Sequence, residues 1–190
     1  ARDSSFIITY IIKNISNEDK SVGPWEVTRR IAGGVSFFPA GPDSAIMKKS
    51  NLPGVTVKDG IVWFEYDANK ITADSKLFAL ASEGWLANVK DSVLFLKTFS
   101  DIPDSQLAPG QGEIEIYANK EKQYIELENH GEYMSLFPGD SITYKMKWTI
   151  KTIPANIDKS PGSQQLVEWV RKVAFKNKFN LKNALLNSED

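Results

Sequence analysis

The chain has 190 residues, of which 42% are hydrophobic and 25% are charged, a length and balance that suit one globular core. Its 23 Lys and Arg against 24 Asp and Glu give a net charge of -1, so no overall positive field attracts polyanions, and nucleic acid is not an expected partner. No apolar run approaches the roughly 20 residues of a membrane span, and the lack of cysteine excludes disulfides and thiolate sites.

Short strands account for most of the pattern along the chain. Residues 6–13 alternate with a period of two before turn residues break the pattern, which predicts a first strand. Residues 142–151 alternate between an apolar face and a face of Lys and Thr. Between them lie shorter β-branched and aromatic runs bounded by turn residues, namely Ile61–Tyr66, Trp85–Val89, Val93–Phe99, Glu113–Tyr117 and Tyr124–Asn129. This pattern predicts a mainly β fold, either a sandwich or a barrel, and we favour an antiparallel β-sandwich.

The core and the C-terminal region follow from two further patterns. Residues 93–96 are apolar at every position, so we expect them in a central strand covered on both faces. Near the C-terminus, Pro161 and Ser163 are helix-start signals, and apolar residues then recur at spacings of three and four around residues 166–174. We therefore predict a β-sandwich domain over residues 1–153, followed by a linker, an amphipathic helix and a tail over residues 154–190, packed on the same domain.

Two acidic segments, residues 112–117 and 124–128, are predicted to form a hairpin. With a turn centred on residues 120 and 121, paired positions sum to 241. Glu115 would then face Glu126, and Glu113 would face Glu128. Like charges directly opposite one another destabilise a sheet, so nearby cations, a metal or protonation must offset them.

Two interpretations of this acidic face remain open. In the first, it is exposed and neutralised by cations such as Arg29 or Arg30, because arginine forks pair carboxylates without further ligands. In the second, it binds a ligand or a metal, and Ca²⁺ would suit clustered oxygen atoms. We expect no cofactor and rank the metal below the arginines; the metal alternative would use Glu113, Glu115, Glu126 and Glu128.

The single histidine and one tryptophan also merit comment. His130 would lie on the same strand face as Glu126 and Glu128 only if that strand continued. Residues 129–131 read as a turn, however, so we interpret His130 as a structural or surface residue. Most tryptophans in a small sandwich are core residues. Trp25 is the expected exception, because polar and basic residues surround it in residues 23–30.

Several motifs follow one another in a distinctive order: Gly23-Pro24-Trp25-Glu26-Val27-Thr28 with Gly33-Gly34 and Pro39, Ile61-Val62-Trp63-Phe64, Gly84-Trp85, Phe95-Leu96-Lys97-Thr98-Phe99, Gly112-Glu113-Ile114-Glu115-Ile116-Tyr117, Glu126-Leu127-Glu128, and Pro138-Gly139-Asp140-Ser141 leading to Trp148. Over residues 6–150, this order resembles an uncharacterised bacterial family of unknown function within the galactose-mutarotase-like superfamily. The resemblance implies a β-supersandwich that binds carbohydrate on one concave face.

In sugar epimerases of that superfamily, a glutamate before a Pro-Gly turn is the base and a histidine on an earlier strand is the acid. The resemblance implies Glu128 as the base, with Glu126 second. Residues 25–30, where the histidine would be sought, contain none, and Arg29 is a poor proton donor at neutral pH. We therefore expect a noncatalytic carbohydrate-binding domain whose ligand contacts are Glu113, Glu115, Glu126, Glu128, Arg29 and Trp25. The alternatives are a sugar epimerase or other carbohydrate-active enzyme with Glu128 as general base, and a structural or assembly module.

The predicted strands are fewer than a complete supersandwich contains. An apolar sheet face would then be exposed, since one helix covers a strip only about 10 Å wide. We expect either a homodimer or a missing N-terminal segment to cover it. The resemblance further favours a periplasmic or secreted location.

Overall fold

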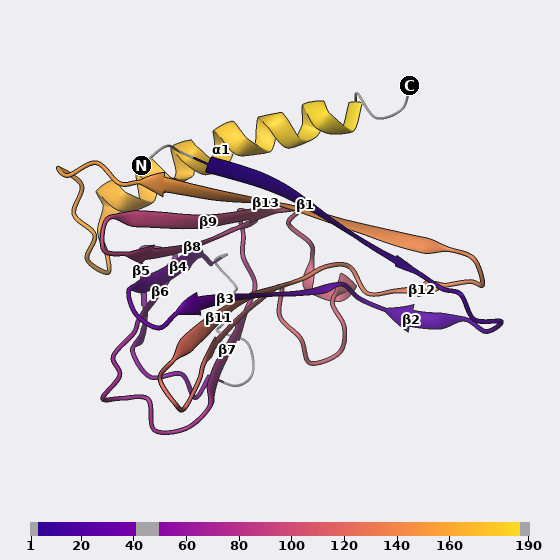
Figure 1. Cartoon of the computed structure of the whole chain (residues 1–190), viewed down its shortest axis with the longest axis horizontal. Coiled ribbons are helices and arrows are strands. Elements are labelled where there is room, and N and C mark those ends of the chain that lie inside the picture. Colours follow the sequence, from indigo (N-terminus) through magenta and orange to yellow (C-terminus); the bar gives the residue numbers. More distant parts are fainter. Residues whose placement is uncertain (1–3, 41–49, 187–190) are drawn as a thin grey trace.

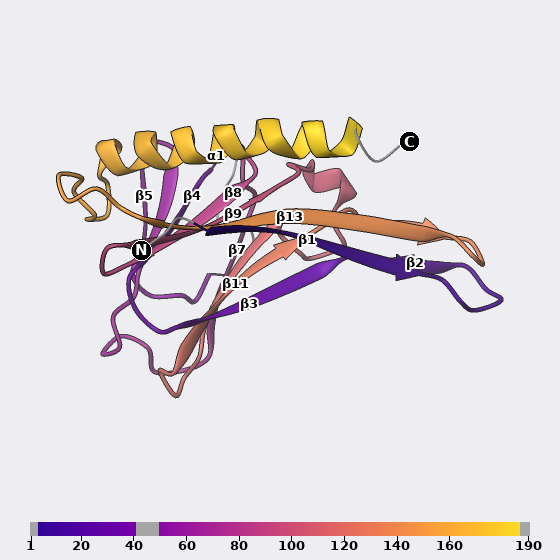
Figure 2. The ribbon, with the colours of Figure 1, turned by 45° about the horizontal axis from the view of Figure 1, so that its top comes forward.

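The computed structural model describes residues 4–40 and 50–186, and it has three layers. A long helix lies along one face of a seven-stranded sheet, and a four-stranded sheet lies against the other face (Figure 1). Turning the molecule shows the same order, with the large sheet in the middle (Figure 2). The predicted antiparallel β-sandwich with a C-terminal helix is confirmed.

The two main sheets are antiparallel throughout. The large sheet has the order β1 (Ser4–Lys13), β13 (Ser141–Thr152), β9 (Val93–Phe99), β8 (Trp85–Lys90), β4 (Val35–Pro39), β6 (Ile61–Glu65) and β5 (Val55–Lys58). The small sheet has the order β3 (Trp25–Ile31), β11 (Tyr124–His130), β10 (Ile114–Ala118) and β7 (Ser75–Ala79). A separate ribbon pairs β12 (Met134–Leu136) with β2 (Lys20–Val22), and residues Asp104–Gln106 form the 3-10 turn η1.

Strand β9 separates two apolar cores, as residues 93–96 predicted. Phe95 and Phe99 pack between the two sheets, whereas Leu94 and Leu96 pack toward α1 (Gln164–Leu186). The helix contributes Leu166, Val167, Val170 and Ala174 to this second core. Both faces of the large sheet are therefore covered over its central strands.

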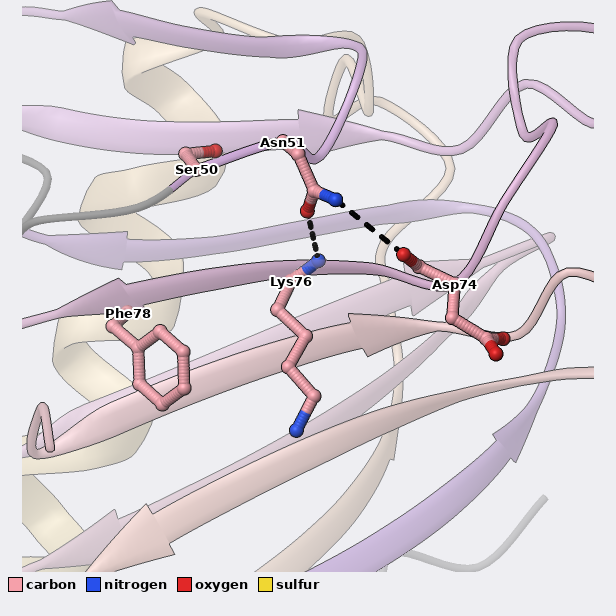
Figure 3. A pocket seen from close by; sticks show the side chains of 5 residues that line it. All are labelled: Ser50, Asn51, Asp74, Lys76 and Phe78. Atoms are coloured by element: carbon pink, nitrogen blue, oxygen red, sulfur yellow. Dashed lines mark hydrogen bonds between the residues drawn. The ribbon is translucent and has the colours of Figure 1, made fainter.

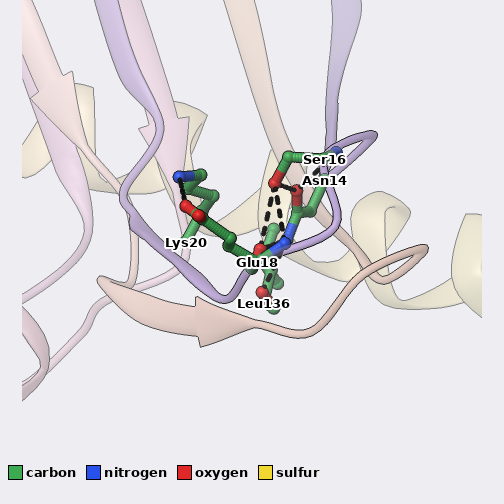
Figure 4. Close-up of polar contacts among 5 residues, drawn as sticks. All are labelled: Asn14, Ser16, Glu18, Lys20 and Leu136. Carbon is green, nitrogen blue, oxygen red and sulfur yellow. Dashed lines mark hydrogen bonds and ion pairs between the residues drawn. The ribbon is translucent and has the colours of Figure 1, made fainter.

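The turn after β1 connects that strand to the small ribbon. The Asn14 side-chain amide donates hydrogen bonds to the carbonyl oxygens of Glu18, at 2.8 Å, and Leu136, at 2.9 Å, and its oxygen accepts the Ser16 backbone N–H at 3.0 Å (Figure 4). Asn14 is 6% exposed, so these bonds satisfy an amide that would be costly to bury alone. One side chain thus fixes the turn and its contact with β12.

The acidic hairpin forms, but the predicted register is wrong. Paired positions sum to 243, so Glu115 lies opposite Glu128 and Tyr117 lies opposite Glu126. The loop closes by hydrogen bonds from Asn119 N to Tyr124 O and from Lys122 N to Asn119 O, and Lys122 has a φ of 62°. A left-handed lysine is uncommon, and it moves the centre of the turn by one residue. The prediction of a turn at residues 129–131 is also wrong at its start, because β11 continues to His130.

Strand β1 forms one edge of the large sheet and exposes apolar side chains on both of its faces. These are Phe6, Ile7, Tyr10 and Ile11. The homodimer or additional N-terminal segment that would cover them remains a prediction. Among the described residues, no helix is both long and apolar enough to cross a membrane.

Candidate functional site

The small sheet has an outer face, which points away from the large sheet. The alternate residues of its strands, such as Leu77, Ile116 and Leu127, point into the core between the sheets. The side chains between them form the outer face: Trp25, Val27, Arg29 and Ile31 on β3; Tyr124, Glu126, Glu128 and His130 on β11; Glu115 and Tyr117 on β10; and Lys76 and Phe78 on β7. Most of the predicted ligand-binding residues belong to this face.

Three outer-face side chains converge although none of them is exposed. Glu115 and Glu128 pair directly across β10 and β11, and His130 follows Glu128 on the same side of β11. Potential ligand atoms of the three residues all lie within 4.8 Å of one another, and the three side chains are buried. We call these residues the Glu115–Glu128–His130 cluster. Two carboxylates and an imidazole at this spacing can bind a cation or exchange a proton.

Each carboxylate of the cluster has one oxygen held by a donor from a neighbouring strand. Lys76 on β7 donates to Glu115 Oε1 at 2.5 Å, and the Trp25 indole N–H on β3 donates to Glu128 Oε2 at 2.5 Å. The second oxygen of Glu115 lies 3.6 Å from His130 Nε2, too far for a hydrogen bond. Glu128 Oε1 and His130 Nε2 are buried without a hydrogen-bond partner in the part of the chain that the structure describes.

The two carboxyl groups differ in pKa. Burial, together with the neighbouring Glu115 charge, raises the pKa of Glu128 to about 7, although the Trp25 hydrogen bond opposes this rise. Burial also acts against ionisation of Glu115, but His130 and Lys76 outweigh it and hold the pKa of Glu115 below its ordinary value. The sheet therefore brings together two carboxylates that repel each other, and one cation, Lys76, only partly compensates them.

Trp25 covers this cluster with an exposed indole, as the sequence predicted for this tryptophan. Its side chain is 58% exposed. The indole stacks on the His130 ring, with centroids 5.6 Å apart and planes at 14°. Because His130 pairs with Trp25 across β11 and β3, the stacking follows directly from the register.

The arginines behave differently from each other. Arg29 Nε donates to Glu126 Oε1 at 2.8 Å and its guanidinium lies 4.4 Å from the centre of the Tyr124 ring. The predicted pairing of an arginine with this acidic face is thus confirmed for Arg29. Arg30 instead points inward, and its guanidinium lies 4.9 Å from the centre of the Phe95 ring.

Glu113 does not join the cluster. It precedes β10, is fully buried, and its carboxylate accepts the backbone N–H groups of Ala81 and Ile102, both at 3.0 Å. The four-glutamate face that we considered for Ca²⁺ is therefore wrong. The carboxylate of Glu113 ties two loops together, while Glu126 lies on the outer face and pairs with Arg29.

A pocket of about 440 Å³ opens beside the cluster at the β7 edge of the small sheet. It is lined by Ser50, Asn51, Asp74, Lys76 and Phe78 (Figure 3). Asn51 shapes it by accepting the Lys76 backbone N–H at 2.8 Å and donating to the Asp74 carbonyl oxygen at 3.4 Å. Lys76 lines the pocket and also binds Glu115, so the pocket and the cluster are adjacent.

Sequence reasoning missed two members of this site. His130 was interpreted as a turn residue, although its alternation with Glu126 and Glu128 places it on their side once β11 continues. No local sequence pattern indicated Lys76. Its contact with Glu115, 39 residues away in the chain, depends on the pairing of β7 with β10. The structure thus adds one imidazole and one ammonium group to the predicted carboxylates.

The fold and this site define a β-sandwich domain with an acid-and-histidine cluster on an outer sheet face. The chain belongs to a family described as a domain of unknown function, DUF4380, whose sequence model matches residues 7–151. This agrees with the predicted membership of a family of unknown function. No curated protein matches the chain.

Two solved structures share part of the fold. A candidate aldose 1-epimerase from Escherichia coli K12 is 12% identical with a TM-score of 0.41, over 78% of this chain and 57% of that protein. A TPR-domain containing protein from Parabacteroides distasonis is 12% identical with a TM-score of 0.42, over 83% of this chain and 30% of that protein. The chain thus spans little more than half of the first protein and under a third of the second. Similarity this low carries no information about activity.

Proposed function

We propose that the outer face of the small sheet binds carbohydrate and that Trp25 is its stacking platform. The exposed indole of Trp25 is the observation on which the proposal rests. A tryptophan that is 58% exposed on a sheet face is unusual in a small sandwich, where most such side chains are core. Sugar rings pack their C–H faces against aromatic rings, and their hydroxyl groups need polar partners at the ring edge.

Polar partners of the required kind surround Trp25. Glu128 lies at the indole N–H, and the Arg29–Glu126 pair follows on the neighbouring positions of β3 and β11. Carboxylates accept hydrogen bonds from sugar hydroxyls, whereas the guanidinium donates them. Of the predicted residues, Trp25, Arg29 and Glu126 therefore offer one mixed surface, the buried Glu115 and Glu128 lie beneath it, and Glu113 is removed from the proposed contacts.

The adjacent pocket gives this surface depth. Its volume of about 440 Å³ falls within the range of small-molecule sites. Trp25 on β3 and this pocket at β7 lie at opposite edges of the four-stranded sheet, so an oligosaccharide that contacted both would cross β11 and β10. We propose recognition of a mono- or oligosaccharide.

A glycan array followed by calorimetry on the wild-type protein tests this function. Trp25→Ala should weaken binding of any sugar found by at least tenfold, because it removes the platform. Phe137→Ala is the matched control, since Phe137 is 62% exposed but lies beyond β12, outside the outer face. If no sugar binds, or if Trp25→Ala and Phe137→Ala bind the same sugar equally well, the proposal is wrong.

A second candidate is a sugar epimerase or other carbohydrate-active enzyme with Glu128 as general base. One observation favours it. His130 on β11, which lies opposite Trp25 and two residues from Glu128, would take the role of the histidine missing from residues 25–30. A base and an imidazole then lie beside the same proposed sugar platform. Sugar binding with no turnover of any bound aldose would exclude this candidate. Measured turnover that survives Glu128→Gln would exclude Glu128 as its base.

A further inference from the structure

We infer that Glu115, Glu128 and His130 form a binding site for one divalent transition-metal ion, with Glu115 Oε2, Glu128 Oε1 and His130 Nε2 as ligand atoms. The inference deepens the proposed function, since a bound ion would lie beside Trp25 where sugar hydroxyls are expected. Metal binding can nevertheless be measured without any sugar, so the two proposals can fail separately.

The first argument concerns charge. Register places Glu115 directly opposite Glu128, and both side chains are 1% exposed. Like charges in this position repel, and burial strengthens the repulsion because water no longer screens it. Lys76 compensates one of the two carboxylates through Glu115 Oε1. A divalent ion between them would compensate the other.

The second argument concerns unpartnered atoms, and it is independent of the first. Glu128 Oε1 and His130 Nε2 are buried and have no hydrogen-bond partner among residues 4–40 and 50–186. His130 is 6% exposed. Leaving such atoms without a partner destabilises the folded state, and more so for charged groups. Buried polar atoms of this kind call for a partner from outside the chain, and here both belong to a group whose ligand atoms lie within 4.8 Å of one another.

The third argument is that the ligands are already oriented. Lys76 holds Glu115 Oε1 and the Trp25 indole N–H holds Glu128 Oε2, which leaves the other oxygen of each carboxylate for the shared centre. Outer hydrogen bonds of this type orient the ligands in known metal sites. The stacking of Trp25 on His130 likewise restrains the imidazole. The pattern distinguishes this cluster from an acidic patch with freely rotating side chains.

The donor set selects the class of ion. An imidazole with two carboxylates suits Zn²⁺, Co²⁺ or Mn²⁺, whereas Ca²⁺ requires six to eight oxygen ligands. A tetrahedral zinc site holds its ligand atoms roughly 3.4 Å apart, so side chains now within 4.8 Å reach it by a small closing rotation. Three protein ligands leave a fourth position for water or a sugar hydroxyl.

The test is calorimetric titration of the full chain, freed of metal with a chelator, by Zn²⁺, Co²⁺, Mn²⁺ and Ca²⁺ separately. We expect one Zn²⁺ or Co²⁺ per chain, at least tenfold weaker Ca²⁺ binding, and visible absorption bands from bound Co²⁺. Glu128→Gln and His130→Gln should each weaken Zn²⁺ binding by more than tenfold. Glu126→Gln is the matched control, because it makes the same change two residues away on the same face, and its affinity should stay within about twofold of wild type.

Each outcome decides the question. Circular dichroism identifies any variant that fails to fold, and then the other ligand variant and the Co²⁺ spectrum of the wild type decide. Absence of binding by every transition ion overturns the inference, as does equal weakening by Glu126→Gln and Glu128→Gln. Sugar binding in chelator without metal binding removes only this inference, whereas metal binding without any sugar ligand removes only the proposed function.

Discussion

Buried charged side chains lie on both sides of strand β11, and they differ in how completely they are hydrogen-bonded. On the inner side, Lys97 from β9 crosses the space between the sheets to pair with Glu26 and to donate to the Leu127 carbonyl oxygen at 2.7 Å. Thr28 donates to the other Glu26 oxygen at 2.6 Å. On the outer side, Glu128 and His130 each keep a buried atom without a partner within the described segments.

The difference separates a structural charge network from the proposed binding site. Inside, Lys97 and Glu26 pair with each other, whereas Arg30 Nε and the neutral side chain of Asn129 beside Glu26 have no hydrogen-bond partner among the residues described. A paired buried network rigidifies the sandwich. Outside, Glu128 on β11 faces the like charge of Glu115 on β10, and Glu128 Oε1 and His130 Nε2 lack a hydrogen-bond partner within the described part of the chain. Sites of function commonly retain such locally unfavourable arrangements. The predictions below aim to break or sharpen this contrast.

The largest effect is expected on the inner side. Lys97→Met should lower the free energy of unfolding by about 3 to 5 kcal/mol, because methionine, unlike even a neutral lysine, has no N–H to donate to the buried Glu26 carboxylate and the Leu127 carbonyl oxygen. The double variant Glu26→Gln/Lys97→Met should recover most of this loss, since the isolated charge is gone. Urea unfolding of both proteins measures the two values. Equal stability of the single and double variants would contradict the structural role of the pair.

The Lys97–Glu26 pair should also make the free energy of unfolding depend on pH. Burial lowers the pKa of Lys97 from 10.5 to about 8, so the unfolded chain binds this proton more tightly than the folded one. The resulting penalty is complete below pH 8 and disappears as the pH rises from about 8 to 10.5. Wild type should therefore gain on the order of 2 kcal/mol by pH 10 relative to the double variant. Urea unfolding across this window checks it, and a constant difference would contradict it.

Substitution of two glutamates near the hairpin, Glu113 and Glu126, should lower stability by different amounts, because their hydrogen-bond partners differ. Glu113→Gln should cost about 2 kcal/mol, because its buried carboxylate holds the N–H groups of Ala81 and Ile102. Glu126→Gln should cost less than about 1 kcal/mol, since its partner Arg29 is 66% exposed. Thermal and urea unfolding of the two variants give the comparison. Equal losses would show that the backbone contacts of Glu113 are not the cause.

Much of the fold could be predicted from the sequence, because period-two alternation marks strands such as β1 and β13 regardless of their partners. Strand β3 was not predicted from the sequence, and the reason is physical. Its polar residues, Glu26 and Thr28, point into the molecule, whereas Trp25 and Val27 point outward, so its pattern is the reverse of an ordinary half-buried strand. A structure that buries Glu26 against Lys97 cannot be recognised from β3 alone.

The candidate site was predictable only in part for a related reason. Glu115 and Glu128 were identified by alternation, but their pairing depended on a turn whose centre the left-handed Lys122 moves by one residue. His130 depended on where β11 ends, and strand ends are poorly encoded by local pattern. Lys76 required a contact between distant strands. Sequence alone thus located the acidic strands, while the register determined which carboxylates meet.

The most direct test of this contrast is the stability of Glu128→Gln in the presence of a chelator. If the outer cluster is maintained for binding, removing one of two opposed charges should raise the free energy of unfolding by up to about 1 kcal/mol, because the new amide can donate toward Glu115. Urea unfolding of wild type, Glu128→Gln and the control Glu126→Gln measures it. Our account predicts that Glu128→Gln is the most stable of the three. A loss of more than about 1 kcal/mol in Glu128→Gln would contradict it and would show that the cluster supports the fold.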